Sequence, residues 1–140
     1  MPGAIQFFKA DVAFRFSGKA NISKWILKVV KQESGNIANL SVVFCSDEYL
    51  LNINRQYLKH DYYTDIITFD NSDRGSVSGE LYISIDRVKD NASELDIPFE
   101  RELKRVMIHG VLHLLGYKDK TTSQQKSIRK REDEALGMIE

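Results

Sequence analysis

The chain has 140 residues, of which 42% are hydrophobic and 29% are charged, a composition typical of one globular domain with its own core. Its 20 basic and 20 acidic residues cancel, so net charge neither favours nor excludes a nucleic-acid partner. The single cysteine, Cys45, excludes an internal disulfide and a thiolate-rich zinc site, and no stretch approaches the ~18 apolar residues that span a bilayer.

We therefore expect a cytoplasmic protein with no membrane partner and no disulfide partner, and the start of the chain shows no secretory signal. Cys45 lies in an apolar run and is interpreted as a small core residue. The oligomeric state stays open at this level.

The apolar periodicities predict four strands and five helices in the order β-α-β-α-β-β-α-α-α. Strands are expected at 1–16 with a break near 9–11, at 39–45, at 64–69 and at 79–85. Helices are expected at 21–34, 46–57, 86–95, 98–115 and 122–136. Their N-caps are expected at Asn21 or Ser23, at Ser46 or Asp47, at Asp86, and at Thr121 or Thr122.

Two residues delimit the fourth helix, which carries most of the chemistry. Pro98 suits its first turn, and Gly116 suits a left-handed position just after its end. The element order mixes hairpin and crossover connections. We therefore expect a single α+β domain over residues 1–140, with a mixed sheet of about four strands packed with about five helices.

The fourth helix contains two of the three histidines, His109 and His113, four residues apart in an apolar stretch. Residues i and i+4 of a helix share one face, so both imidazoles can bind one metal ion. The zincin proteases carry a glutamate directly after the first histidine, but this chain has Gly110 there, which excludes that class by signature. The alternative is an amphipathic helix whose histidines are satisfied by hydrogen bonds.

Three motifs in chain order resemble the YbeY family, the metal-dependent endoribonucleases and rRNA maturation factors of bacteria. They are Thr-Asp-Ile-Ile-Thr-Phe at 64–69, Gly-Glu-Leu-Tyr-Ile-Ser at 79–84 and His-Gly-Val-Leu-His-Leu-Leu-Gly-Tyr at 109–117. The family pattern is approximately T-D-V-L-S-F, then G-D-I, then H-G-x-L-H-L-x-G-Y-D-H. The chain departs from it at Glu80 and Lys118, where the family has aspartate, and at Asp119, where the family has histidine.

The resemblance implies one YbeY-like metal-binding domain that holds one zinc ion. Two ligands would be His109 and His113, and the position of the family's third ligand falls on Asp119. An aspartate oxygen is an acceptable zinc ligand, but its negative charge should make the metal a weaker Lewis acid. His60 is the alternative third ligand, although its polar surroundings favour a solvated surface residue.

The resemblance also suggests residues around the metal. Arg55 matches the family's arginine and would stabilise charge on a phosphoryl group; otherwise it is a solvated helix residue. Asp65 would orient a ligand histidine through a hydrogen bond, or else cap a turn. Lys118 and Lys120 could contact RNA phosphates, as could Arg105 on the histidine helix, or these residues could form ordinary solvated faces.

The function implied is a zinc-dependent, single-strand-specific endoribonuclease acting in maturation of the 16S rRNA 3′ end and in ribosome quality control. Its partners would be ribosomal RNA and the small ribosomal subunit. One alternative is a ribosome-associated assembly factor with a structural metal and little or no nuclease activity. Another is a metal-dependent hydrolase of some other small substrate.

Overall fold

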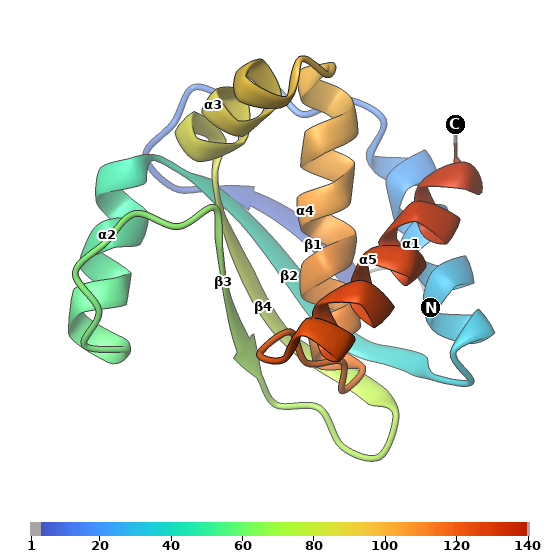
Figure 1. The fold of residues 1–140 in the computed structure, drawn as a ribbon. Coiled ribbons are helices and arrows are strands. Elements are labelled where there is room, and N and C mark those ends of the chain that lie inside the picture. The colour runs from blue at the N-terminus through green and yellow to red at the C-terminus, as the bar shows by residue number, and fades with distance from the viewer. Residues whose placement is uncertain (1–3, 140) are drawn as a thin grey trace.

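The computed structural model describes residues 4–139, and over this range the chain forms the nine expected elements in the expected order (Figure 1). The strands are β1 (Ile5–Lys9), β2 (Asn36–Cys45), β3 (Ile66–Asp70) and β4 (Ser76–Ser84). The helices are α1 (Lys19–Gln32), α2 (Asp47–Tyr57), α3 (Ile85–Leu95), α4 (Phe99–Leu114) and α5 (Thr122–Gly137).

The four strands form one mixed sheet in the order β1-β2-β4-β3. The β1–β2 and β2–β4 pairs are parallel, while β3 pairs antiparallel with β4 across the connection 71–75. The first two crossovers contain α1 and α2, as parallel connections require. The predicted α+β fold with a four-stranded mixed sheet and five helices is confirmed.

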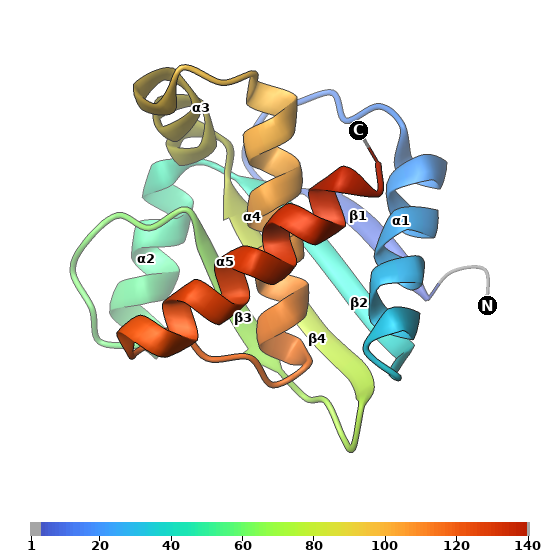
Figure 2. The same ribbon diagram turned by 45° about the vertical axis from the view of Figure 1, so that its right-hand side comes forward.

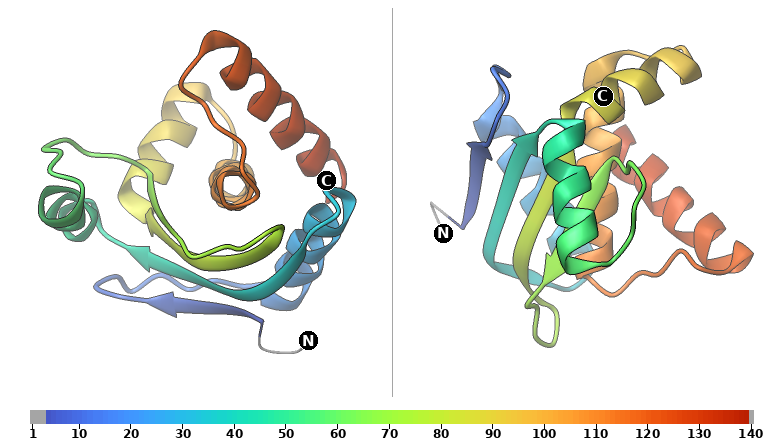
Figure 3. Two further views of the ribbon diagram at one scale, coloured as in Figure 1. Left: turned by 90° about the horizontal axis from the view of Figure 1, so that it is seen from below. Right: turned by 90° about the vertical axis from the view of Figure 1, so that its left-hand side faces the viewer.

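Helix α4 lies in the hollow of the curved sheet and is enclosed by the other elements. Seen end-on in Figure 3, it sits above the sheet with α5 beyond it and α1 to one side. Nine of its 16 residues are buried, because alternate side chains of β2 and β4 pack against it. Figure 2 shows α5 crossing over α4, so the last helix lies on the outer side of the histidine helix.

Helix α2 packs on the opposite face of the sheet. Its Leu50 and Ile53 contact a second cluster that includes Ile67, Phe69 and Tyr82. Side chains alternate along a strand, so these residues face away from α4, whereas Leu81 and Ile83 of β4 face it.

The first predicted strand is wrong beyond Lys9, because residues 10–18 are irregular. Phe14 and Phe16 are apolar for a different reason: their rings pack on Phe44, with centroids 5.2 and 4.9 Å away. Helix α1 also begins earlier than predicted, at Lys19. The residue before it, Gly18, has a φ of 78° and provides no side-chain cap.

The other three predicted N-caps can be compared with the structure. Ser46 and Thr121 cap α2 and α5 as predicted, and Thr121 forms a capping box with Gln124. Helix α3 is capped by Ser84 instead of Asp86, because the Ser84 hydroxyl accepts from the backbone of Arg87.

Cys45 is a free, fully buried thiol. Among residues 4–139, no helix combines the length and the apolar character needed to cross a membrane.

Candidate metal centre

Helix α4 carries both histidines, and Gly110 between them faces the sheet. A Cβ at Gly110 would lie 2.7 Å from Cδ1 of Ile66 and 2.8 Å from Cδ2 of Leu81, so this position faces the sheet closely. The place where a zincin carries its catalytic glutamate is therefore occupied by sheet packing in this chain. That geometry explains why Gly110 stands between the two histidines.

The chain turns back sharply after α4 and brings Asp119 alongside that helix. Gly116 has a φ of 107°, which is the left-handed backbone predicted for it. The Tyr117 hydroxyl donates to Glu33 Oε1 over 2.6 Å, which ties the turn to the end of α1. The Gln125 amide donates to the backbone oxygen of Asp119 over 3.0 Å, which ties it to α5.

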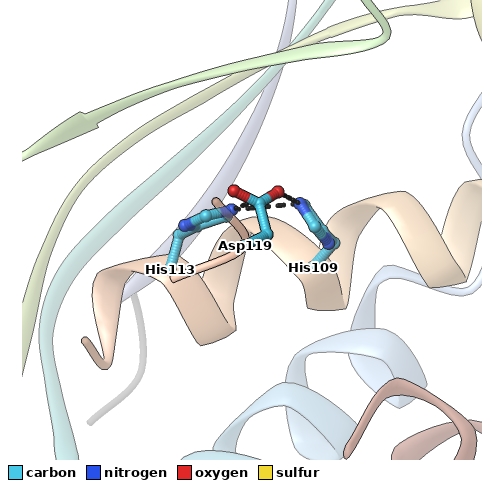
Figure 4. A group of neighbouring side chains, drawn as sticks. All are labelled: His109, His113 and Asp119. Carbon is cyan, nitrogen blue, oxygen red and sulfur yellow. Dashed lines mark hydrogen bonds and ion pairs between the residues drawn. The ribbon is translucent and has the colours of Figure 1, made fainter. Parts of the chain in front are cut away.

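The two imidazoles and the carboxylate converge on one point, as Figure 4 shows. The Nε2 atoms of His109 and His113 are 3.0 Å apart, and Asp119 Oδ2 lies 3.4 Å from each of them. Ligand atoms held about 2.0–2.1 Å from a tetrahedral zinc ion lie about 3.3 Å from one another. The three side chains thus already have the spacing of a zinc ligand set.

The cluster also remains open to solvent. The side chains of His109, His113 and Asp119 are 20%, 27% and 42% exposed. A structural zinc site normally has four protein ligands and is closed, whereas a catalytic site has three and leaves one position for water or substrate. Three ligand groups gathered at the surface match the second kind.

A buried carboxylate that the sequence analysis did not single out orients His109. Glu132 on α5 is 1% exposed, and its Oε2 lies 2.5 Å from His109 Nδ1. A proton on Nδ1 is donated to this carboxylate, which leaves the lone pair of Nε2 free to bind a metal. The sequence carries one signal that Glu132 is buried, namely its position on the helix. Glu132 is four residues after Ile128 and four before Leu136, on the buried stripe of α5.

Glu132 belongs to a chain of buried charges. Arg105 donates to Glu102 through two nitrogens, at 2.8 and 2.5 Å, and to Glu132 Oε1 over 3.3 Å. Burial acts to raise the pKa of Glu132, but its hydrogen bond to His109 and the charges of His109 and Arg105 outweigh this, so the pKa is lowered. Arg105 is therefore an internal partner of two carboxylates and not a surface contact for phosphates.

The hydrogen bond that Asp65 was expected to make is made by Glu132. The Asp65 carboxylate accepts from the Asn91 amide over 3.4 Å, and within residues 4–139 no hydrogen bond joins it to either histidine of the cluster. Burial raises the pKa of Asp65, while the charges of Arg105 and His109 act to lower it. Asp65 is therefore not the residue that orients His109 in this structure.

The structure does not bring Arg55 or His60 into the cluster. The Arg55 guanidinium pairs with Asp61 at 2.5 Å, just before β3, and the catalytic role of Arg55 stays a prediction. The His60 ring stacks on Tyr62, which removes it as a candidate third ligand in this arrangement. Lys118 and Lys120 flank Asp119 and are exposed.

Comparison with known proteins adds a consistent result. The family model described as Endoribonuclease YbeY matches residues 8–140. An Endoribonuclease YbeY of Cytophaga hutchinsonii is 50% identical, over 96% of this chain and 94% of its own length, and one of Amoebophilus asiaticus is 48% identical over 94% and 91%. A Thermotoga maritima protein solved in solution superposes with a TM-score of 0.66 at 30% identity, covering 96% of this chain and 90% of its own.

Proposed function

The chain belongs to the YbeY family of endoribonucleases, and on this premise we propose that it hydrolyses phosphodiester bonds of single-stranded RNA at the cluster of His109, His113 and Asp119. The observation that supports this most is the spacing of the three ligand atoms, which all lie within 4.8 Å of one another. Family membership supplies the RNA substrate, and the cluster supplies the place where the bond is broken.

We propose that the three residues hold one zinc ion per chain. When bound, zinc would lower the pKa of a coordinated water towards roughly 7 and so provide hydroxide at neutral pH. Glu132 would keep His109 in the tautomer that binds through Nε2. The carboxylate of Asp119 would replace the imidazole of the family's third ligand and reduce the positive charge at the centre.

Arg55 is proposed to stabilise the negative charge that gathers on the phosphoryl oxygens during cleavage. Its side chain is 52% exposed and its partner Asp61 is 74% exposed, so the ion pair between them is solvated and contributes little to stability. The guanidinium can therefore leave Asp61 when an RNA phosphate competes for it. Lys118 and Lys120, on either side of Asp119, are proposed to hold neighbouring phosphates.

The biological setting proposed is the one that the family resemblance implies. The substrate would be ribosomal RNA, cleaved during maturation of the 16S 3′ end and during ribosome quality control in the cytoplasm, and the partner would be the small ribosomal subunit.

Metal content and cleavage, measured on the same preparations, test the proposal. We expect wild type to bind one zinc ion and to cleave single-stranded RNA. His113→Ala and Asp119→Ala should lose metal and cleavage together, whereas Asp119→His should keep both because it retains three ligands. Arg55→Ala should keep its metal and lose most of the cleavage. Full zinc at unchanged affinity in Asp119→Ala would refute this ligand set.

The same experiment separates the alternatives. A wild type that holds zinc and binds small ribosomal subunits, yet cleaves no RNA, would be an assembly factor with a structural metal. Cleavage of small phosphodiesters without cleavage of RNA would indicate the other hydrolase.

A further inference from the structure

Exposed aromatic side chains lie at the end of α2 and on the connection that follows it to β3. We call residues 57–63 the aromatic loop. Eight large hydrophobic side chains are exposed in the described part of the chain, and four of them fall within these seven residues: Tyr57, Leu58, Tyr62 and Tyr63. Scattered exposed apolar residues are normal, but four of them within seven residues indicate a contact surface.

The aromatic loop has a fixed backbone. Asn54 is 1% exposed; its amide donates to the backbone oxygen of Tyr62 over 2.9 Å, and its own backbone oxygen accepts from the His60 N–H over 3.1 Å. The rings are therefore presented outward by a loop that is anchored to a buried side chain.

Tyr62 is an exposed ring whose position is held by contacts with His60. It is 55% exposed and stacks on His60, with centroids 5.1 Å apart and planes 20° from parallel. Tyr63 is already engaged, because its hydroxyl donates to Glu48 and Arg87 lies over its ring at 5.6 Å. One face of Tyr62 is covered by the imidazole, which leaves its other face to receive a flat partner.

The aromatic loop is joined to the strand that packs on the histidine helix. Ile66, three residues after the loop, packs against Gly110 of α4, which lies between the two histidines in sequence. Both views of Figure 3 show this connection on the side of α2 that faces α4 and α5. A chain molecule with one phosphate at the centre could thus place neighbouring groups on the loop.

We propose that the aromatic loop is a stacking platform for the bases of single-stranded RNA, centred on the His60–Tyr62 pair. The inference rests on the proposed function, because the loop leads into the strand that packs on the helix of the centre assigned to RNA cleavage. The surface is aromatic with polar tips, beside the cations of Lys59 and Arg55, and this combination suits bases linked by phosphates. Stacking on rings tolerates any base and requires that the bases be unpaired.

Binding of a short single-stranded RNA to the metal-free protein, followed by fluorescence anisotropy, tests the platform without relying on cleavage. We expect Tyr62→Ala to weaken binding about 5- to 150-fold, the range measured for loss of one stacked base. Tyr62→Phe should bind within about twofold of wild type, because it keeps the ring. Phe8→Ala is the matched control, since Phe8 is 48% exposed on β1, the strand at the sheet edge opposite β3.

An RNA of the same length without bases distinguishes stacking from phosphate binding. Wild type and Tyr62→Ala should bind it equally weakly. A second readout is the fluorescence of Tyr62→Trp, whose new emission should be quenched by RNA. The native Trp25 should not respond to RNA, because it is buried and donates a hydrogen bond to the Ala135 carbonyl. Native Trp25 emission in every variant shows that the fold is retained.

Three results would overturn the platform. The first is equal RNA affinity of Tyr62→Ala and wild type while wild type still cleaves RNA, which leaves the proposed function standing. The second is an equal loss of affinity for the RNA without bases, which indicates a structural effect. The third is Tyr62-dependent binding to a protein of the small subunit without any effect on RNA. If wild type neither binds nor cleaves RNA, the proposed function itself fails.

Discussion

Replacing Glu132 with glutamine should weaken zinc binding although Glu132 is not itself a ligand. The substitution preserves the volume of a side chain that is 1% exposed and removes its charge. His109 then loses the carboxylate that holds a proton on Nδ1, and the glutamine amide can present an N–H to that nitrogen instead. Part of the metal-free protein would then carry its proton on Nε2, the atom that has to bind the metal.

The expected loss is about 10- to 100-fold in zinc affinity, the usual effect of removing a carboxylate behind a ligand histidine. That range corresponds to about 1.4–2.7 kcal/mol of binding free energy. Arg105 keeps both of its bonds to Glu102, so no buried cation is left alone. The fold should therefore lose only about 1–3 kcal/mol, the cost of one charged hydrogen bond.

Competition against a chromophoric chelator measures the affinity, and nitrogen chemical shifts of His109 in the metal-free protein report its tautomer. Glu134→Gln is the control, because Glu134 lies on the same helix but pairs with Arg131 at the surface. Glu132→Asp should recover part of the affinity. An affinity of Glu132→Gln within twofold of wild type, with an unchanged tautomer, would refute the argument.

Three further outcomes follow from the packing and the pKa shifts. Gly79→Ala should destabilise the fold by more than about 2 kcal/mol in urea denaturation, because the added Cβ would lie 2.2 Å from the Phe69 backbone oxygen. Gly137→Ala is the control, because a Cβ at that position has no neighbouring atom within 4 Å. Burial raises the folded-state pKa of Asp65 above its unfolded value, so the ionised carboxylate disfavours folding at neutral pH. Asp65→Asn should therefore be more stable than wild type at pH 7. The difference should vanish near about pH 3, where Asp65 is protonated in both the folded and the unfolded protein. Burial raises the pKa of the Cys45 thiol to about 12, so a thiol reagent at about pH 8 should react only after urea unfolds the chain; rapid labelling of the native protein would contradict this.

Much of the fold could be predicted because its signals are local. The helix carrying His109 and His113 follows from apolar periodicity, and its end follows from a glycine that tolerates a left-handed backbone. Asp119 was predicted from its place relative to the family motif, and the structure brings it to 3.4 Å from both histidines. Its role as a ligand remains a proposal.

The remaining features depend on tertiary contacts that spacing does not encode. Phe14 and Phe16 have the alternation of a strand, yet they are held by rings from β2 and the backbone around them pairs with no neighbouring strand. Glu132 stands among charged residues of α5, and its role follows only from the crossing of α5 over α4. Arg55 and Asp65 were given roles by position along the chain, and their partners prove to be Asp61 and Asn91.

The dependence of the metal centre on α5 has a consequence during synthesis of the protein. Glu132 enters the site only when the last helix docks, and that helix is bonded to the first one through Trp25 and the Ala135 carbonyl, 110 positions apart. A nascent chain on which α5 has not yet docked therefore has both histidines but lacks the carboxylate that fixes the His109 ring. Because domains fold as units, full zinc affinity should arise only after α5 has been translated and has docked on α4.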